Sequence, residues 1–75
     1  MEKHDFIKEF PEYRDRILTL KLENRHFRKL FEEYQTLDTR INQFETGSDF
    51  CTDEYLNELR LKRVHIKDSL YKHLR

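Results

Sequence analysis

The chain has 75 residues, of which 36% are hydrophobic and 40% charged, and its 15 lysines and arginines balance its 15 aspartates and glutamates. A formal net charge of zero excludes the global attraction to nucleic acid or anionic lipid that a basic protein has, and the chain lacks the high net charge of a disordered segment. The length allows one domain, whose single hydrophobic core gives only marginal stability, so self-association is an early expectation.

The single cysteine and the start of the chain bear on where the protein works. Cys51 cannot form an intramolecular disulfide, and residues 1–5 lack the apolar segment of a secretory signal. No stretch approaches the roughly 20 apolar residues that a transmembrane helix requires. We therefore expect a cytoplasmic protein that does not enter a membrane.

Two residues, Pro11 and Gly47, interrupt a sequence that otherwise favours helix. Pro11 suits the first turn of a helix, so an N-terminal arm at 1–11 should lead into a first helical arm at 12–45. Apolar residues recur along that arm in steps of three and four. They are Ile17, Leu20, Phe27, Leu30, Phe31, Tyr34, Leu37, Ile41 and Phe44.

Asn24 and Asp38 are polar insertions in this stripe, and Asn24 leaves the shape of the first arm open. Asparagine is a strong N-cap, so the helix either breaks at Asn24 or continues through it. In either case the residues before Asn24 lie beyond the hairpin described next and need a partner. Tyr13, Ile17 and Leu20 must either fold back over Val64 and Tyr71 or pair with another copy of the chain.

A second helix is predicted at 53–73, because Gly47 suits the end of the preceding helix and Thr52 the start of the next. Its stripe consists of Leu56, Leu59, Arg63, Ile66, Leu70 and Leu74. When the chain folds back at the loop, a single register places the two stripes face to face. The sequence therefore predicts an all-α protein with a single domain at 1–75. This domain is an antiparallel helical hairpin with a short N-terminal helical segment, and it can assemble into a helical bundle.

The same register places two charged residues, Asp38 and Arg63, in facing stripes. We expect them to form an interhelical ion pair. The alternative is that Arg63 lays its stem over Leu37 and reaches water. Pairing would fix the register, because a slip by one helical turn would place each charge against an apolar side chain.

Several aromatic and aliphatic residues are not used by the hairpin, and exposed aromatic clusters favour protein interfaces. These candidate partner-surface residues are Phe6, Ile7, Phe10, Tyr13, Ile17, Leu20 and Tyr71. Self-association through the segment before Asn24 is the simplest use of this apolar surface.

No group of residues in the sequence suggests catalysis or metal binding. No two of the four histidines stand three or four residues apart, as a two-ligand helical metal site requires. Neighbouring carboxylates such as Glu32 and Glu33 fall on polar helix faces, without the burial that acid catalysis by a carboxyl group requires. We expect a protein that is not an enzyme and has no metal, cofactor or small-molecule substrate.

Short motifs spread over nearly the whole chain support a family resemblance. They are Phe10-Pro11-Glu12-Tyr13-Arg14-Asp15, Asn24-Arg25-His26-Phe27, Leu37-Asp38-Thr39-Arg40-Ile41, Glu45-Thr46-Gly47 and Ile66-Lys67-Asp68. In combination they resemble the YdcH-like family of small bacterial proteins, which has no assigned biochemical function. The resemblance implies a cytoplasmic bacterial helical hairpin and brings no catalytic residues.

The sequence thus predicts a non-enzymatic helical interaction module that associates with itself or binds a protein partner. The alternative is a nucleic-acid-associated accessory protein that uses the basic residues around Phe27 and along the last helix. Nucleic-acid binding is disfavoured, because the stripe already needs Phe27 and neither a helix-turn-helix nor an aromatic stacking platform is visible.

Overall fold

The computed structural model describes residues 6–75, which form helices joined by short connections. In chain order these elements are α1 (Phe6–Glu9), the 3-10 turn η1 (Pro11–Tyr13), α2 (Arg14–Glu23), α3 (Arg25–Glu45) and α4 (Asp53–Leu74). The described part of the chain contains no strand, so the all-α class predicted from the sequence is confirmed. Of the N-terminal arm predicted at 1–11, Phe6–Glu9 form α1 and Pro11 begins η1, while residues 1–5 lie outside the described range.

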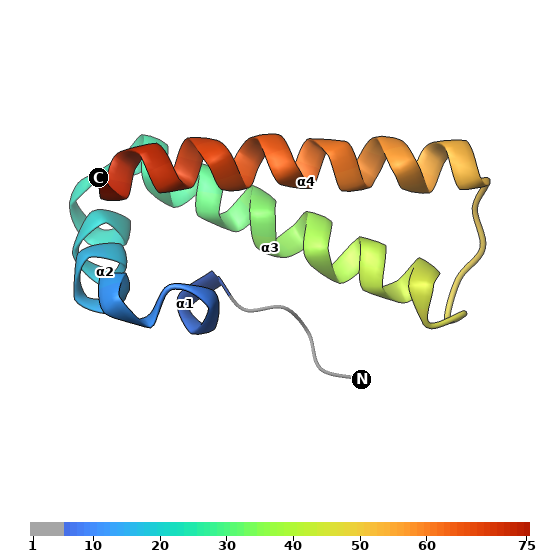
Figure 1. Ribbon diagram of the computed structural model, residues 1–75, viewed down its shortest axis with the longest axis horizontal. Helices are drawn as coiled ribbons and strands as arrows, with labels where there is room; N and C mark the ends of the chain where they lie inside the picture. The colour runs from blue at the N-terminus through green and yellow to red at the C-terminus, as the bar shows by residue number, and fades with distance from the viewer. Residues whose placement is uncertain (1–5) are drawn as a thin grey trace.

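The two long helices α3 and α4 run antiparallel and form the predicted hairpin (Figure 1). Gly47 ends α3 because its φ of +79° lies in the left-handed region, where glycine carries no Cβ penalty. Thr52 begins α4, and its hydroxyl accepts a hydrogen bond from the Tyr55 N–H at 3.1 Å. The turn residues that the sequence identified therefore act at the predicted places.

Asn24 separates α2 from α3 and is the one non-helical residue between them. Its N–H donates to the Leu20 carbonyl at 2.8 Å and ends α2, while its Oδ1 accepts from the Phe27 N–H at 3.0 Å and caps α3. Its backbone is extended, with φ −115° and ψ 106°. Of the two arrangements that the sequence left open, the structure has the broken helix.

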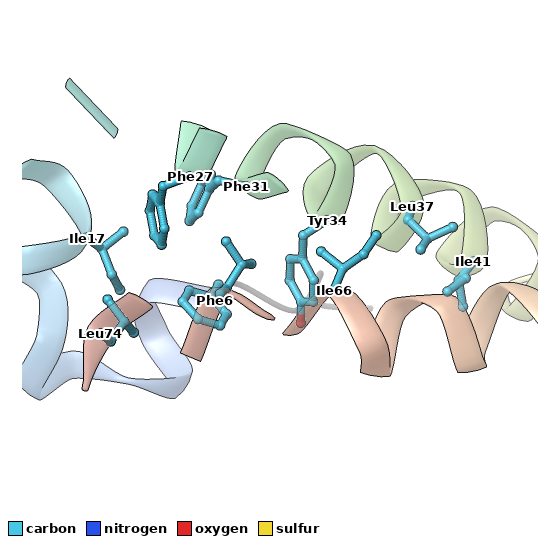
Figure 2. Packing of buried hydrophobic residues seen from close by; sticks show 10 residues of the cluster. Phe6, Ile17, Phe27, Phe31, Tyr34, Leu37, Ile41, Ile66 and Leu74 are labelled. Carbon is cyan, nitrogen blue, oxygen red and sulfur yellow. The ribbon is translucent and has the colours of Figure 1, made fainter. Parts of the chain in front are cut away.

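This break places α1 and α2 against one end of the hairpin, the end at which α3 begins and α4 finishes (Figure 1). Phe6 is buried there against the rings of Phe31 and Tyr34, with ring centroids 6.1 and 5.6 Å apart. Ile17 is fully buried, and it belongs with Leu74 to the apolar cluster drawn in Figure 2. The buried apolar core is Phe6, Ile17, Phe27, Phe31, Tyr34, Leu37, Ile41, Ile66, Leu70 and Leu74.

The segment before Asn24 therefore does not extend beyond the hairpin. It folds back over Tyr71, which packs against Phe10 and Tyr13 with ring centroids 5.5 and 6.1 Å away. It does not cover Val64, which stays 53% exposed, so that half of the fold-back expectation was wrong. The physical reason is that Asn24 directs α2 to the terminal turns of α4, whereas Val64 lies further back along that helix.

Candidate interaction surface

Asp38 and Arg63 form the ion pair that the register predicted. Arg63 Nη1 donates to Asp38 Oδ1 at 2.9 Å across the hairpin. The Asp38 side chain is 2% exposed and that of Arg63 is 23% exposed, so the guanidinium keeps some access to water while the carboxylate has almost none. The structure thus has the ion pair across the seam rather than the alternative, in which Arg63 reaches water without pairing and Asp38 lies at the seam edge.

The second carboxylate oxygen of Asp38 is buried and has no hydrogen-bond partner among residues 6–75. A buried carboxylate that is only half satisfied contributes little net stability, because its desolvation opposes its attraction to the guanidinium. Asp38 also does not line either of the surface hollows described below. The pair is therefore suited to aligning α3 with α4.

The candidate partner surface is largely consumed by the fold. Phe6 and Ile17 are fully buried inside the chain's own core. The other candidates are half-buried and pack against that core: Ile7, Phe10, Tyr13, Leu20 and Tyr71. These side chains, for which the sequence predicted no intramolecular contact, therefore pack against the hairpin of the same chain. Less apolar surface is left for binding a second protein.

Aromatic rings of this segment form a small cluster on the C-terminal end of α4. A hydrogen bond to Tyr71 is the main reason that the pKa of the Tyr13 phenol lies above its ordinary value of 10.0. Lys67 pairs with Glu9 and lies 5.6 Å from the centre of the Phe10 ring. These contacts fasten the N-terminal segment to the hairpin.

A groove with a volume of about 930 Å³ lies between α3 and α4. Its floor contains Leu37 and Ile66, which are largely buried, and the half-buried Leu59. Its walls carry charges of both signs and the half-exposed Tyr55. The full lining is Lys29, Glu32, Glu33, Gln35, Thr36, Leu37, Thr39, Arg40, Gln43, Tyr55, Leu59, Lys62 and Ile66.

No lining residue of this groove belongs to α1 or α2, so the N-terminal segment leaves this part of the hairpin open. A second hollow of about 340 Å³ adjoins it through Lys62 and Ile66 and adds Leu61, which is 60% exposed. The sequence pattern predicted Leu37, Leu59 and Ile66 as seam residues and not as part of an open surface. The signal that could have indicated the surface is that Tyr55 and Lys62 alternate with Leu59 and Ile66 in steps of three and four, at the edge of the seam.

Three of the basic side chains along the last helix that could attract nucleic acid are paired with carboxylates of the same chain. Arg63 pairs with Asp38, Arg60 with Glu45, and Lys67 with Glu9. Intramolecular pairing neutralises the local positive field that phosphate contacts require.

The histidines and the cysteine do not form a metal site within residues 6–75. The rings of His26 and His73 lie 5.7 Å apart, but no three histidine, cysteine or acidic side chains in that range could hold an ion together. Cys51 is a free, exposed thiol. None of the helices in the described part of the chain combines the length and apolar character that a bilayer crossing requires.

Comparisons with known proteins agree with the resemblance carried by the sequence motifs. Residues 27–74, which contain most of α3 and all of α4, match the family described as Protein of unknown function (DUF465). The Uncharacterized proteins YdcH of Escherichia coli (strain K12) and of Shigella flexneri are each 33% identical over 63 residues, which is 84% of this chain and 85% of each relative. No solved structure matches the chain. The chain belongs to the DUF465 family of YdcH-like bacterial proteins.

Proposed function

We propose that this protein is a non-enzymatic helical interaction module that binds a helical segment of a protein partner, either another protein or a second copy of itself. The observation that carries the proposal is the open groove between α3 and α4, with its apolar floor and its rim of both charge signs. Amphipathic helices bind in grooves of this kind by laying their apolar face on the floor. The hairpin supplies a rigid frame for such a surface.

The chemistry of the groove favours protein over a small substrate or nucleic acid. The lining contains no histidine and no cysteine, and its acidic residues Glu32 and Glu33 are exposed rather than buried. Three basic residues, Lys29, Arg40 and Lys62, share the rim with these two acids. A rim of mixed charge suits the polar border of a protein interface.

Affinity capture from the bacterial cell, with and without nuclease, tests the proposal together with a matched pair of variants. Thr36→Arg places a long charged side chain in the groove, whereas Thr19→Arg makes the same change at an exposed position of α2 outside the groove. We expect a nuclease-resistant partner that Thr36→Arg releases and Thr19→Arg retains. A partner that nuclease removes, or that both variants retain, would contradict the proposal.

A further inference from the structure

The N-terminal segment, residues 6–23, is joined to the hairpin through a single non-helical residue, Asn24. The segment contributes two fully buried core side chains, Phe6 and Ile17, to a site built by α3 and α4. Its place in the monomer therefore depends on one backbone turn, while most of its stabilisation comes from packing against the hairpin. A short hinge that connects a packed element to the rest of a domain is the arrangement that permits exchange between copies.

The sequence on both sides of the hinge is also compatible with one continuous helix. The residues Ile17, Leu20, Asn24, Phe27 and Phe31 follow one another in steps of three, four, three and four. Straightening the chain at Asn24 removes the cap on the Phe27 N–H and adds the helical hydrogen bonds that the break interrupts. The contacts of Phe6 and Ile17 are lost from the same chain but can be remade identically with another.

We infer that a second copy of this chain is a binding partner, and that the two copies exchange residues 6–23 by straightening at Asn24. Each hairpin then holds the α1–α2 segment of the other copy in the site that its own segment fills in the monomer. The inference rests on the proposed function only in naming a second copy as partner, because it uses the core site of the N-terminal segment and not the groove between α3 and α4.

Two exposed leucines of α2 support this choice of partner. Leu22, two residues before the hinge, is 84% exposed, and Leu18, one turn earlier on the same face, is 40% exposed. Exchanged copies meet at their hinges, where each straightened helix passes the other. The leucines would be covered there, whereas the monomer leaves them in water.

Two variants at neighbouring positions shift the equilibrium between the broken and the straight helix at Asn24 in opposite directions. Asn24→Ala removes the cap and favours the straight helix by about fivefold per chain, so the dimer dissociation constant should fall about 25-fold because each dimer straightens two hinges. Arg25→Pro stabilises the break, because residue 25 is the first of α3, where proline is accepted, and Asn24 already has the extended backbone that precedes a proline. A proline there blocks the straight helix and should weaken the dimer more than about 100-fold.

The experiment is to refold each full-length chain at high concentration, separate oligomers by sedimentation, and record circular dichroism to show that each variant is helical. A mixture of isotope-labelled and unlabelled chains should give a nuclear Overhauser contact between Phe6 of one copy and Tyr34 of the other, because the centroids of these two rings lie 5.6 Å apart in the monomer. We expect this contact in the dimers of the wild type and of Asn24→Ala. If Asn24→Ala fails to fold, the comparison of the wild type with Arg25→Pro decides the matter.

The outcomes also separate this inference from the proposed function. A dimer that Arg25→Pro abolishes and Thr36→Arg leaves intact supports exchange. The groove is then tested separately, by the affinity capture of a protein partner described above. A dimer that Thr36→Arg abolishes and Arg25→Pro leaves intact supports the groove and overturns exchange. A wild type that stays monomeric after concentrated refolding, or a dimer without the contact between copies, also overturns exchange.

Discussion

Replacing Arg63 by methionine tests how the pair with Asp38 contributes to stability. Methionine keeps most of the apolar stem but leaves the Asp38 carboxylate, which is 2% exposed, without the hydrogen bond from Arg63. Removal of one member of a buried pair costs roughly 3–5 kcal/mol. Because the Arg63 side chain is 23% exposed and water can reach its vacated position, we expect the lower end, about 3 kcal/mol.

The converse change should cost less. Asp38→Leu leaves a guanidinium that can turn further into water, so we expect a loss of about 1–2 kcal/mol. The double variant removes the desolvated carboxylate together with its unpartnered oxygen, and such apolar replacements are often neutral or stabilising. The double variant should therefore recover to within about 1 kcal/mol of the wild type, which corresponds to a coupling free energy of roughly 3–5 kcal/mol.

Urea denaturation followed by circular dichroism gives the free energy of unfolding for the four proteins of this cycle. Arg60→Met is a suitable control, because Arg60 lies on the same helix and its ion pair with Glu45 is more exposed and longer, at 3.5 Å. That substitution should cost under about 1 kcal/mol. Additive effects of Asp38→Leu and Arg63→Met, within about 0.5 kcal/mol, would refute the reasoning.

Three further predictions concern the loop and the aromatic cluster. Gly47→Ala should lower the free energy of unfolding by about 1–2 kcal/mol, because the φ of +79° is unfavourable for alanine even though the space around an added Cβ is open. Gly47→Asn should lower it less, because asparagine tolerates this conformation better, and urea denaturation measures both changes. A hydrogen bond from the Phe50 N–H holds the pKa of Asp49 below its ordinary 3.8. The contribution of this hydrogen bond to folding stability should be present above the unfolded-state pKa of Asp49 and fade as the pH falls through the folded-state pKa, which a nuclear magnetic resonance titration of Asp49 can locate. Tyr71→Phe should bring the pKa of Tyr13 back towards 10.0 in an ultraviolet titration. The stability from that hydrogen bond should be present below the unfolded-state pKa and disappear as the pH rises through the folded-state value.

The sequence by itself determined the hairpin and its register. Helical periodicity is local, and both turn signals, Gly47 and Thr52, act through their own backbone and immediate neighbours. Two apolar stripes of fixed spacing, joined by a short loop, can face each other in one register only. That register places Asp38 next to Arg63, as in the structure. The parts of the fold that depend on short-range rules were therefore predictable.

The tertiary structure alone decided what happens on either side of Asn24. A capped break and a continuous helix satisfy the same local rules, and the choice between them depends on burying Phe6 and Ile17 in a site made by residues distant in sequence. That burial removed most of the expected partner surface. The groove between α3 and α4 likewise stays open because the N-terminal segment packs elsewhere. Which apolar side chains stay exposed depends on how the helices pack in three dimensions, and the spacing of residues along the chain does not encode that packing.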